Sequence, residues 1–484
     1  MTTTWGNLRP YENSRGFGMP KGVPRGCELS EVHVLHRHAQ RYPAGEPLEF
    51  VDKLATYKTA HPRRTIGKGS LKFLNDWENL LGMDTLLATG SSTEATSGAN
   101  FWNKYARLLY RAGPGVARWN ESLNVFPNGT ARPHPIFRTT TQDRILESAK
   151  WWLSGFFSDT DANGSQDRYS LVVIPEAERF NNTLAPYFSC TKTHHSGSKS
   201  RGQWTSTYTK DAVERFSNLL PADFNLTGSN VREMQLLCAY EWTGFGGSNF
   251  CSLFTEQEWR DFEYSTDIEF YAESGFGSPV GRAFGIGYVE ELVARLERRL
   301  LYTSDTSVNV DFDSNATTFP LHQPFYLDMS HDVTILAVLT ALGLDYFNHG
   351  PRGLPGDVKR VPRHTFKASE VIPFGARLVS EIWTCPCERP SFERLLAVLY
   401  KNPSLSQKKC TNNYIRFVLN DAPLPLHGLP RCRHSKKGFC PVNQFARALP
   451  ALKKEAMYQW ACFGNYTAPG HQVGNGHPEE LPSA

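Results

Sequence analysis

Two histidines of this 484-residue chain stand beside charged residues in patterns that favour chemistry on a compact anion. His38 lies between Arg37 and Arg41 in the run RHAQR, and His331 directly precedes Asp332. A neutral imidazole is a good nucleophile, and arginine offers forked donors that match the oxygens of phosphate. The pattern predicts a site for a compact dianion, and phosphate is the best candidate.

A third basic position, Arg138, shares an architectural feature with these two clusters. Each of the three follows a segment expected to be a strand, at residues 31–35, 134–137 and 324–330. In an open α/β sheet the carboxyl ends of the strands line one crevice, and the start of the helix after each strand favours an anion. We therefore expect six side chains to converge there: Arg37, His38, Arg41, Arg138, His331 and Asp332.

The residue types suggest a division of labour at this crevice. The arginines disfavour the imidazolium, so they keep His38 neutral in acid while they bind the phosphoryl group and stabilise charge in the transition state. A carboxyl beside a bound phosphate has a raised pKa, which suits Asp332 to protonate the leaving alkoxide. The same carboxylate can then activate water to hydrolyse a phosphohistidine.

The motifs around these residues resemble one enzyme family. RHAQRYP (Arg37–Pro43) is similar to the RHGxRxP signature of the histidine acid phosphatases, and SHD (Ser330–Asp332) is similar to their distal His-Asp pair. Further segments resemble the filamentous-fungal phytase branch in order and spacing. They are WGNLRPY, NNTLAP, IPFGARL and FVLNDAPLPLHG, within a similarity that spans roughly residues 5 to 465.

The resemblance implies an acid phosphatase that works through a phosphohistidine intermediate. No ligand set for a metal is visible in the sequence, so we expect neither a metal nor a cofactor. His38 would be the nucleophile, Asp332 the general acid, and four residues the phosphate clamp: Arg37, Arg41, Arg138 and His331. Phytate (myo-inositol hexakisphosphate) is the substrate it implies first. A broad-specificity acid phosphatase and an inositol-polyphosphate phosphatase remain alternatives, although the latter often has Glu at the position of Asp332.

One departure from the family pattern keeps a non-enzymatic alternative open. The family usually has Gly after the nucleophilic histidine, whereas this chain has Ala39. A positive φ at this position would be strained by a Cβ. An inactive phosphate- or glycan-binding glycoprotein therefore remains the alternative from a different functional class.

Other conspicuous residues have simpler interpretations. We expect Arg144 to be a helix-surface or salt-bridge residue, His194–His195 to lie in a solvated loop, and Trp151–Trp152 to pack rather than bind ligand. A basic cluster after the RHAQRYP motif fits a pocket mouth and a solvated face equally well. Its members are Lys53, Lys58, Arg63, Arg64 and Lys68.

The alternation of predicted strands and helices indicates an α/β fold. We expect a doubly wound, mostly parallel sheet with helices on both faces, plus an inserted, mainly α-helical lobe that covers the active site. Segments 170–176, 376–383 and 414–420 are further strands of this sheet. The expected organisation is a terminal arm at 1–30, the α/β domain at 31–50, 126–190 and 319–450, the helical lobe at 51–125 and 191–318, and a C-terminal arm and tail at 451–484.

Composition excludes several other functions. The chain has 52 basic and 48 acidic residues, a net charge of +4, and no long Lys/Arg run, so it does not look like a nucleic-acid binder. It also has no apolar run of about 18 residues that would span a membrane. We expect a monomer whose only partner is a small phosphorylated substrate.

The cysteines and glycosylation motifs favour an oxidising compartment. Ten cysteines are scattered without a CxxC pair of pairs, which favours disulfides over zinc, and seven Asn-x-Ser/Thr motifs point to a glycoprotein. The first ten residues contain no apolar signal segment, so we expect a secreted protein whose leader is missing from this chain.

Chain geometry and the resemblance together give a disulfide pattern. Short, turn-rich separations favour Cys432 with Cys440 and Cys238 with Cys251. The resemblance implies that Cys27 meets Cys385 and that Cys190 meets Cys462. The pair left by elimination is Cys387 with Cys410.

Overall fold

A computed structural model describes residues 2–45, 48–158, 165–190, 192, 196–387, 411–433, 435–467 and 471–478. His194 and His195, expected in a solvated loop, and Cys410, expected to pair with Cys387, lie outside the described residues.

One eight-stranded sheet forms the centre of the molecule. Its first half is parallel, in the order β3 (Ser170–Ile174), β2 (Ile136–Thr140), β4 (Phe325–Ser330) and β1 (Glu28–Arg37). Antiparallel strands extend it beyond β1: β5 (Arg377–Pro386), β6 (Thr411–Leu419) and β7 (Ala422–Pro423), with β8 (Cys440–Pro441) paired to β6. The three later strand segments predicted from the sequence therefore belong to one sheet.

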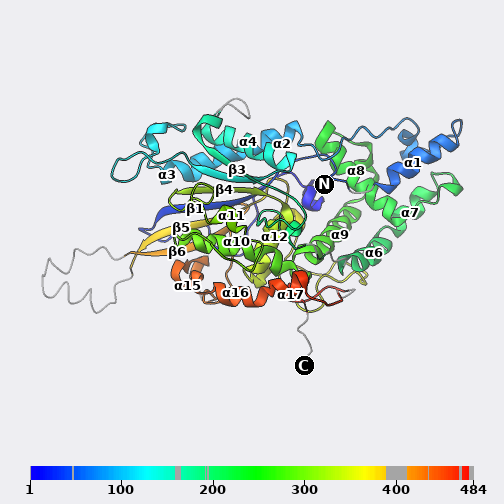
Figure 1. The fold of residues 1–484 in the computed structure, drawn as a ribbon. Coiled ribbons are helices and arrows are strands. Elements are labelled where there is room, and N and C mark those ends of the chain that lie inside the picture. Colours follow the sequence, from blue (N-terminus) through cyan, green and yellow to red (C-terminus); the bar gives the residue numbers. More distant parts are fainter. Residues whose placement is uncertain are drawn as a thin grey trace, which may run out of the picture.

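Helices cover both faces of this sheet, as the sequence predicts (Figure 1). On one face, Val32 and Val34 of β1 pack in a cluster with Phe101 and Trp152, which lie on α2 (Ala88–Phe101) and α4 (Asp143–Phe157). On the other face, Leu35 belongs to a cluster with residues of α10 (Gly281–Leu296) and α12 (Asp332–Ala341). Successive side chains of a strand point to opposite faces, so β1 contributes to the hydrophobic core on each side of the sheet.

Helix α2 lies within residues 51–125, which the sequence predicts to be part of the helical lobe, but it packs on α4 against the sheet. A Cβ added at Gly98 would lie 1.9 Å from the carbonyl oxygen of Trp152, and one at Gly155 would lie 1.9 Å from that of Ala95. The two helices therefore touch along their backbones. The sequence of α2, ATGSSTEATSGANF, has few large apolar residues, so its periodicity does not show which surface it covers.

A group of helices lies beyond one end of the sheet (Figure 1). It comprises α1 (Glu49–Ala60), α6 (Ser196–Tyr208), α7 (Lys210–Ser217), α8 (Gly228–Phe245) and α9 (Glu256–Ser274). Capping boxes at Thr227 and Thr255 satisfy free N–H groups at the starts of α8 and α9. The remaining α-helices among the described residues are α3 (Arg107–Leu109), α5 (Pro186–Ser189), α11 (Val310–Asp313), α13 (Ala368–Val371), α15 (Val442–Ala446), α16 (Leu449–Ala456) and α17 (Tyr458–Phe463).

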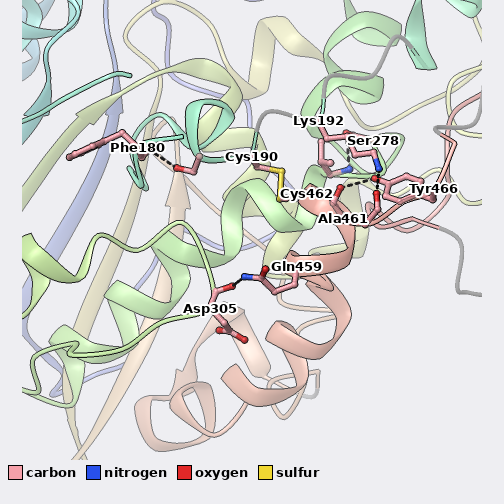
Figure 2. The surroundings of a disulfide bond; sticks show 12 residues. Phe180, Cys190, Lys192, Ser278, Asp305, Gln459, Ala461, Cys462 and Tyr466 are labelled. Atoms are coloured by element: carbon pink, nitrogen blue, oxygen red, sulfur yellow. Dashed lines mark hydrogen bonds between the residues drawn. A yellow bond between two sulfur atoms is a disulfide. The ribbon is translucent and has the colours of Figure 1, made fainter. Parts of the chain in front are cut away.

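Four of the five expected disulfides are present. Their Cα–Cα distances are 4.1 Å for Cys27–Cys385, 4.9 Å for Cys190–Cys462, 4.9 Å for Cys238–Cys251 and 5.4 Å for Cys432–Cys440. Figure 2 shows how the Cys190–Cys462 bond joins the end of α5 to α17.

The sequence contains no apolar run long enough to span a membrane, and the helices can be compared with that prediction. Within the described ranges, none of the helices combines the length and the apolar character needed to cross a bilayer.

Candidate active site

The ends of β1 and β4 bring the two histidine clusters together. Arg37 and Ser330 are in register at the last position of their strands, and the backbone N–H of His38 donates to the carbonyl of Ser330 at 3.1 Å. The rings of His38 and His331 have centroids 6.2 Å apart. Asp332 is the first residue of α12, so both clusters lie at the carboxyl edge of the parallel strands.

Arg37 is fully buried and held on several sides. One guanidinium nitrogen donates to the carbonyls of Asn7 and Ile372, each at 2.6 Å. The other lies 2.8 Å from Oδ2 of Asp332, and the guanidinium sits 4.6 Å from the centre of the Phe374 ring. This arginine therefore fixes the position of the Asp332 carboxylate. Burial lowers the pKa of Arg37 to about 10.

His38 is held as a neutral imidazole. Its Nδ1 lies 2.8 Å from the carbonyl oxygen of Ala39, which can only accept, so Nδ1 carries the hydrogen and Nε2 the lone pair. Burial, followed by the charges of Arg37, Arg144 and Arg41, holds the pKa of His38 well below its usual range. Ala39 is not among the residues with positive φ, so the strain expected from a Cβ after the histidine is absent.

His331 has two polar partners that sequence reasoning did not identify. Its Nε2 lies 2.8 Å from Oε1 of Glu176, just after β3, and 3.1 Å from the hydroxyl of Tyr187 on α5. Burial alone would raise the pKa of Glu176, but its contacts with His331 outweigh burial and lower it. Glu176 therefore holds the imidazole of His331 from the side of β3.

Asp332 is charged in the ligand-free site. Burial raises the pKa of its carboxyl, but the guanidinium of Arg37 and a hydrogen bond from Asn7 outweigh burial and lower it. The raised pKa expected from the sequence refers to the state with phosphate bound. A dianion placed among these groups would disfavour a second negative charge and shift the pKa of Asp332 upward.

Arg138 lies elsewhere, which corrects its expected place in the clamp. The strand extends to Thr140, so Arg138 is in the middle of β2, opposite Asp328 of β4. Its guanidinium contacts Asp328 at 2.6 Å, Glu291 at 2.5 Å and Asp313 at 3.5 Å. Three carboxylates already surround this buried cation, and the structure does not bring it to the other five predicted residues.

Arg144 is the basic residue that β2 and α4 place beside His38 instead. It is the second residue of α4, is 7% exposed, and is among the charges that lower the pKa of His38. It also forms the ion pair expected from its sequence position, with Asp84. The signal that could have identified it was the strand–helix junction itself, because α4 begins at Asp143 rather than near Arg138.

The sequence model of the histidine phosphatase superfamily, branch 2, matches residues 28–420. The chain belongs to this family. Phytase A of Aspergillus fumigatus is 29% identical over 457 residues, which are 92% of this chain and 87% of that protein. Phytase A of Emericella nidulans is 29% identical over 456 residues, with the same coverage of 92% and 87%. This histidine phosphatase is therefore a phosphoric monoester hydrolase.

Solved structures of two other proteins share the fold. A phytase from D. castellii superposes with a TM-score of 0.69 at 21% identity, over 96% of this chain and 88% of the other. The multiple inositol polyphosphate phosphatase of Bifidobacterium longum, in complex with inositol hexasulfate, superposes with a TM-score of 0.60 at 11% identity, over 92% and 97%. These comparisons support the arrangement of sheet and helices described above.

A cavity of about 390 Å³ lies among the N-terminal arm and helices α6, α8 and α9. Asn7, which contacts Asp332, lines it together with helix residues that include Tyr240. Arg201 and Arg232 also line it, and both pair with Glu269.

The basic cluster after the RHAQRYP motif is partly occupied in holding the helices together. Lys53 and Lys58 donate to the backbone carbonyls of Asn225 and Trp77, each at 2.6 Å. Arg64 pairs with Asp223 at 2.8 Å. Trp152 packs as predicted, fully buried and stacked on Phe156.

Proposed function

We propose that this histidine phosphatase hydrolyses phytate, with His38 as nucleophile and Asp332 as proton donor. The observation that supports the mechanism is the state of His38. Its imidazole is neutral, its Nε2 carries a free lone pair, and arginines surround it. Arg37, Arg41 and His331 form the phosphate clamp, and Arg144 takes the place expected of Arg138.

The first chemical step transfers the phosphoryl group to the imidazole. The lone pair of His38 Nε2 forms a bond to phosphorus while the bond from phosphorus to the ester oxygen breaks, and its electron pair goes to that oxygen. Asp332 donates a proton to the departing oxygen, so an alcohol leaves rather than an alkoxide. The surrounding guanidiniums stabilise the negative charge that spreads over the phosphoryl oxygens.

The second step regenerates the enzyme. Asp332, now a carboxylate, accepts a proton from water while the water oxygen attacks phosphorus and the bond to Nε2 breaks. Inorganic phosphate leaves, and both groups return to their starting state. In the absence of bound phosphate the low pKa of Asp332 returns it to the ionised form.

Phytate as the substrate is supported by the similarity to Phytase A proteins over 92% of this chain. It is further supported by a cavity that Asn7, a contact of Asp332, lines together with Arg201 and Arg232. A secreted protein is supported by the four disulfides and by the glycosylation motifs of the sequence.

The deciding experiment compares kcat/KM for phytate and for p-nitrophenyl phosphate at acidic pH. A higher value for phytate supports the proposal. A higher value for p-nitrophenyl phosphate favours a broad-specificity acid phosphatase, and no turnover of either substrate favours the binding glycoprotein. Activity should persist in EDTA, and inhibition that added zinc reverses would contradict the metal-free mechanism.

A further inference from the structure

Asn7 contacts both partners of the catalytic ion pair from a distant part of the chain. It lies in a short 3-10 turn, Gly6–Leu8, 325 residues before Asp332. Its side-chain nitrogen donates to Oδ2 of Asp332 at 3.2 Å, and its backbone carbonyl accepts from Arg37 at 2.6 Å. One residue of the N-terminal arm therefore touches the proton donor and the arginine that fixes it.

The arm is anchored by packing that is independent of the active site. Trp5 is fully buried and lies 6.3 Å from Trp242 and 6.4 Å from Trp259, measured between ring centroids. Gly6 has a φ of +57°, and a Cβ there would lie 2.4 Å from the side chain of Thr266. Only glycine fits this turn, so the backbone of Asn7 is placed by contacts with α8 and α9.

The two oxygens of Asp332 have different surroundings. Oδ2 faces the guanidinium of Arg37 at 2.8 Å and the amide N–H of Asn7 at 3.2 Å. Oδ1 accepts from the backbone N–H of Val333 at 2.9 Å. An acid hydrogen on Oδ2 would meet a cation and a second donor, whereas Oδ1 keeps acceptor capacity for a proton.

We propose that Asn7 is a positioning residue which, together with Arg37, reserves Oδ2 of Asp332 as an acceptor and leaves the transferable proton on Oδ1. This inference rests on the proposed role of Asp332 as proton donor. In the absence of the amide, the carboxyl can rotate and protonate on either oxygen. A smaller fraction of enzyme–substrate complexes then has the acid proton directed at the leaving oxygen.

The test uses leaving groups that differ in their need for a proton. We would measure kcat/KM of the wild type, Asn7→Ala and Asn7→Leu for glycerol 2-phosphate, whose alkoxide needs protonation, and for p-nitrophenyl phosphate, whose phenolate hardly does. The control is Asn13→Ala, which removes an exposed asparagine of the same arm whose side-chain oxygen accepts from the hydroxyl of Tyr11. Leu approximates the size of Asn without the donor, and thermal unfolding checks that each variant is folded.

The expected result is a fall of about tenfold for glycerol 2-phosphate and of less than about threefold for p-nitrophenyl phosphate. The alkaline limb of the glycerol 2-phosphate profile should also move to higher pH, because the hydrogen bond from Asn7 helps to lower the pKa of Asp332. Asn13→Ala should behave as the wild type.

Other outcomes separate this inference from the proposed function. Equal losses on both substrates with an unmoved alkaline limb would make Asn7 a purely structural residue, and wild-type kinetics in both Asn7 variants would leave it without a role. Either result overturns the inference while an active wild type sustains the proposed function. A wild type inactive on both substrates overturns the two together.

Discussion

The hydrogen bond between Nδ1 of His38 and the carbonyl of Ala39 determines which nitrogen of the ring can react. It leaves the Nε2 lone pair free, while burial and three arginines keep the ring neutral. The family motif usually has Gly after this histidine, but the bond needs only a backbone carbonyl, which alanine supplies equally well. The Ala39 position is therefore compatible with turnover.

Replacement of His38 should abolish covalent catalysis. In His38→Ala the clamp remains but no atom can accept the phosphoryl group, so kcat should fall by about four orders of magnitude. Rapid-quench labelling of the wild type should give an acid-labile, base-stable phosphoprotein that the variant lacks. Retention of full activity by His38→Ala would exclude this nucleophile.

The loss of activity caused by replacing Asp332 should depend on the leaving group of the substrate. Asp332→Asn keeps the shape of the side chain but cannot donate an acidic proton, so kcat for glycerol 2-phosphate should fall by about 10²-fold or more. The loss for p-nitrophenyl phosphate should be several-fold smaller. If the two losses are equal, Asp332 orients the substrate instead of protonating it.

The two arginines of the β2–α4 region should have opposite phenotypes. Arg144→Ala should lower kcat/KM by about 10²-fold with a small change in stability, since a clamp residue acts in the transition state. Arg138→Ala leaves Asp328, Glu291 and Asp313 without their shared cation. The free energy of unfolding should then fall by about 3–5 kcal/mol, as measured by urea denaturation.

The reverse pattern for these two variants would restore the clamp role that the sequence predicts for Arg138. A third variant, Arg144→Lys, serves as a matched control because it keeps the charge and loses the forked donors. It should recover part of the lost kcat/KM.

At the scale of elements, helix α2 places an unusual carboxyl behind the catalytic strand. Glu94 is fully buried, its Oε2 lies 3.7 Å from Nδ1 of His36, and within the described part of the chain neither carboxyl oxygen has a hydrogen-bond partner. Burial raises the pKa of Glu94 well above its usual range, although Arg377 and Arg37 oppose the effect. Glu94 is therefore protonated in the acidic range in which this enzyme is expected to work.

This carboxyl should make the protein less stable as the pH rises. The folded state has the higher pKa, so its contribution is fully present below the unfolded value of about 4.3 and is lost progressively above it. Glu94→Gln mimics the protonated form and should match the wild type near pH 4 but have the higher free energy of unfolding near pH 7. A difference between the two proteins that is the same at both pH values would contradict this assignment.

The elements themselves could be predicted from sequence to different degrees. The predicted strand at 31–35 is alternating and β-branched, and the one at 324–330 is mostly apolar and aromatic; the structure confirms both, with β1 extending to Arg37. The end of β2 was misplaced by three residues, at Phe137 instead of Thr140, because the run RTTTQD after Phe137 contains no apolar residue. That error exchanged the roles of Arg138 and Arg144, since a buried arginine inside a strand needs partners that only the fold supplies.

At the scale of the whole molecule, disulfides connect segments that are far apart in sequence. Cys190–Cys462 spans 272 residues, and around it the ammonium of Lys192 lies 3.5 Å from the centre of the Tyr466 ring (Figure 2). The double variant Cys190→Ser, Cys462→Ser should lose about 2–5 kcal/mol of stability, because its unfolded chain is less restricted. The matched double variant of Cys238 and Cys251, only 13 residues apart, should lose less.

These losses would be measured as changes in the unfolding midpoint in urea without reductant. Dithiothreitol reduces all the disulfides, so the reduced wild type should be less stable than either double variant. No shift in either variant would mean that the crosslinks do not limit the unfolded chain.

The sequence by itself determined the reaction class, because RHAQRYP and SHD are local strings whose residue types already specify a nucleophile, a clamp and an acid. It also indicated the α/β class, through strand–helix alternation, and favoured the two short-range disulfides, whereas Cys27–Cys385 and Cys190–Cys462 were implied by the resemblance to the histidine acid phosphatases. Only the tertiary structure decided that Arg144 rather than Arg138 stands beside His38, that Asn7 reaches Asp332, and that α2 covers the sheet. Each of these depends on which distant segments pack together, and contacts between residues hundreds of positions apart leave no periodicity in the chain.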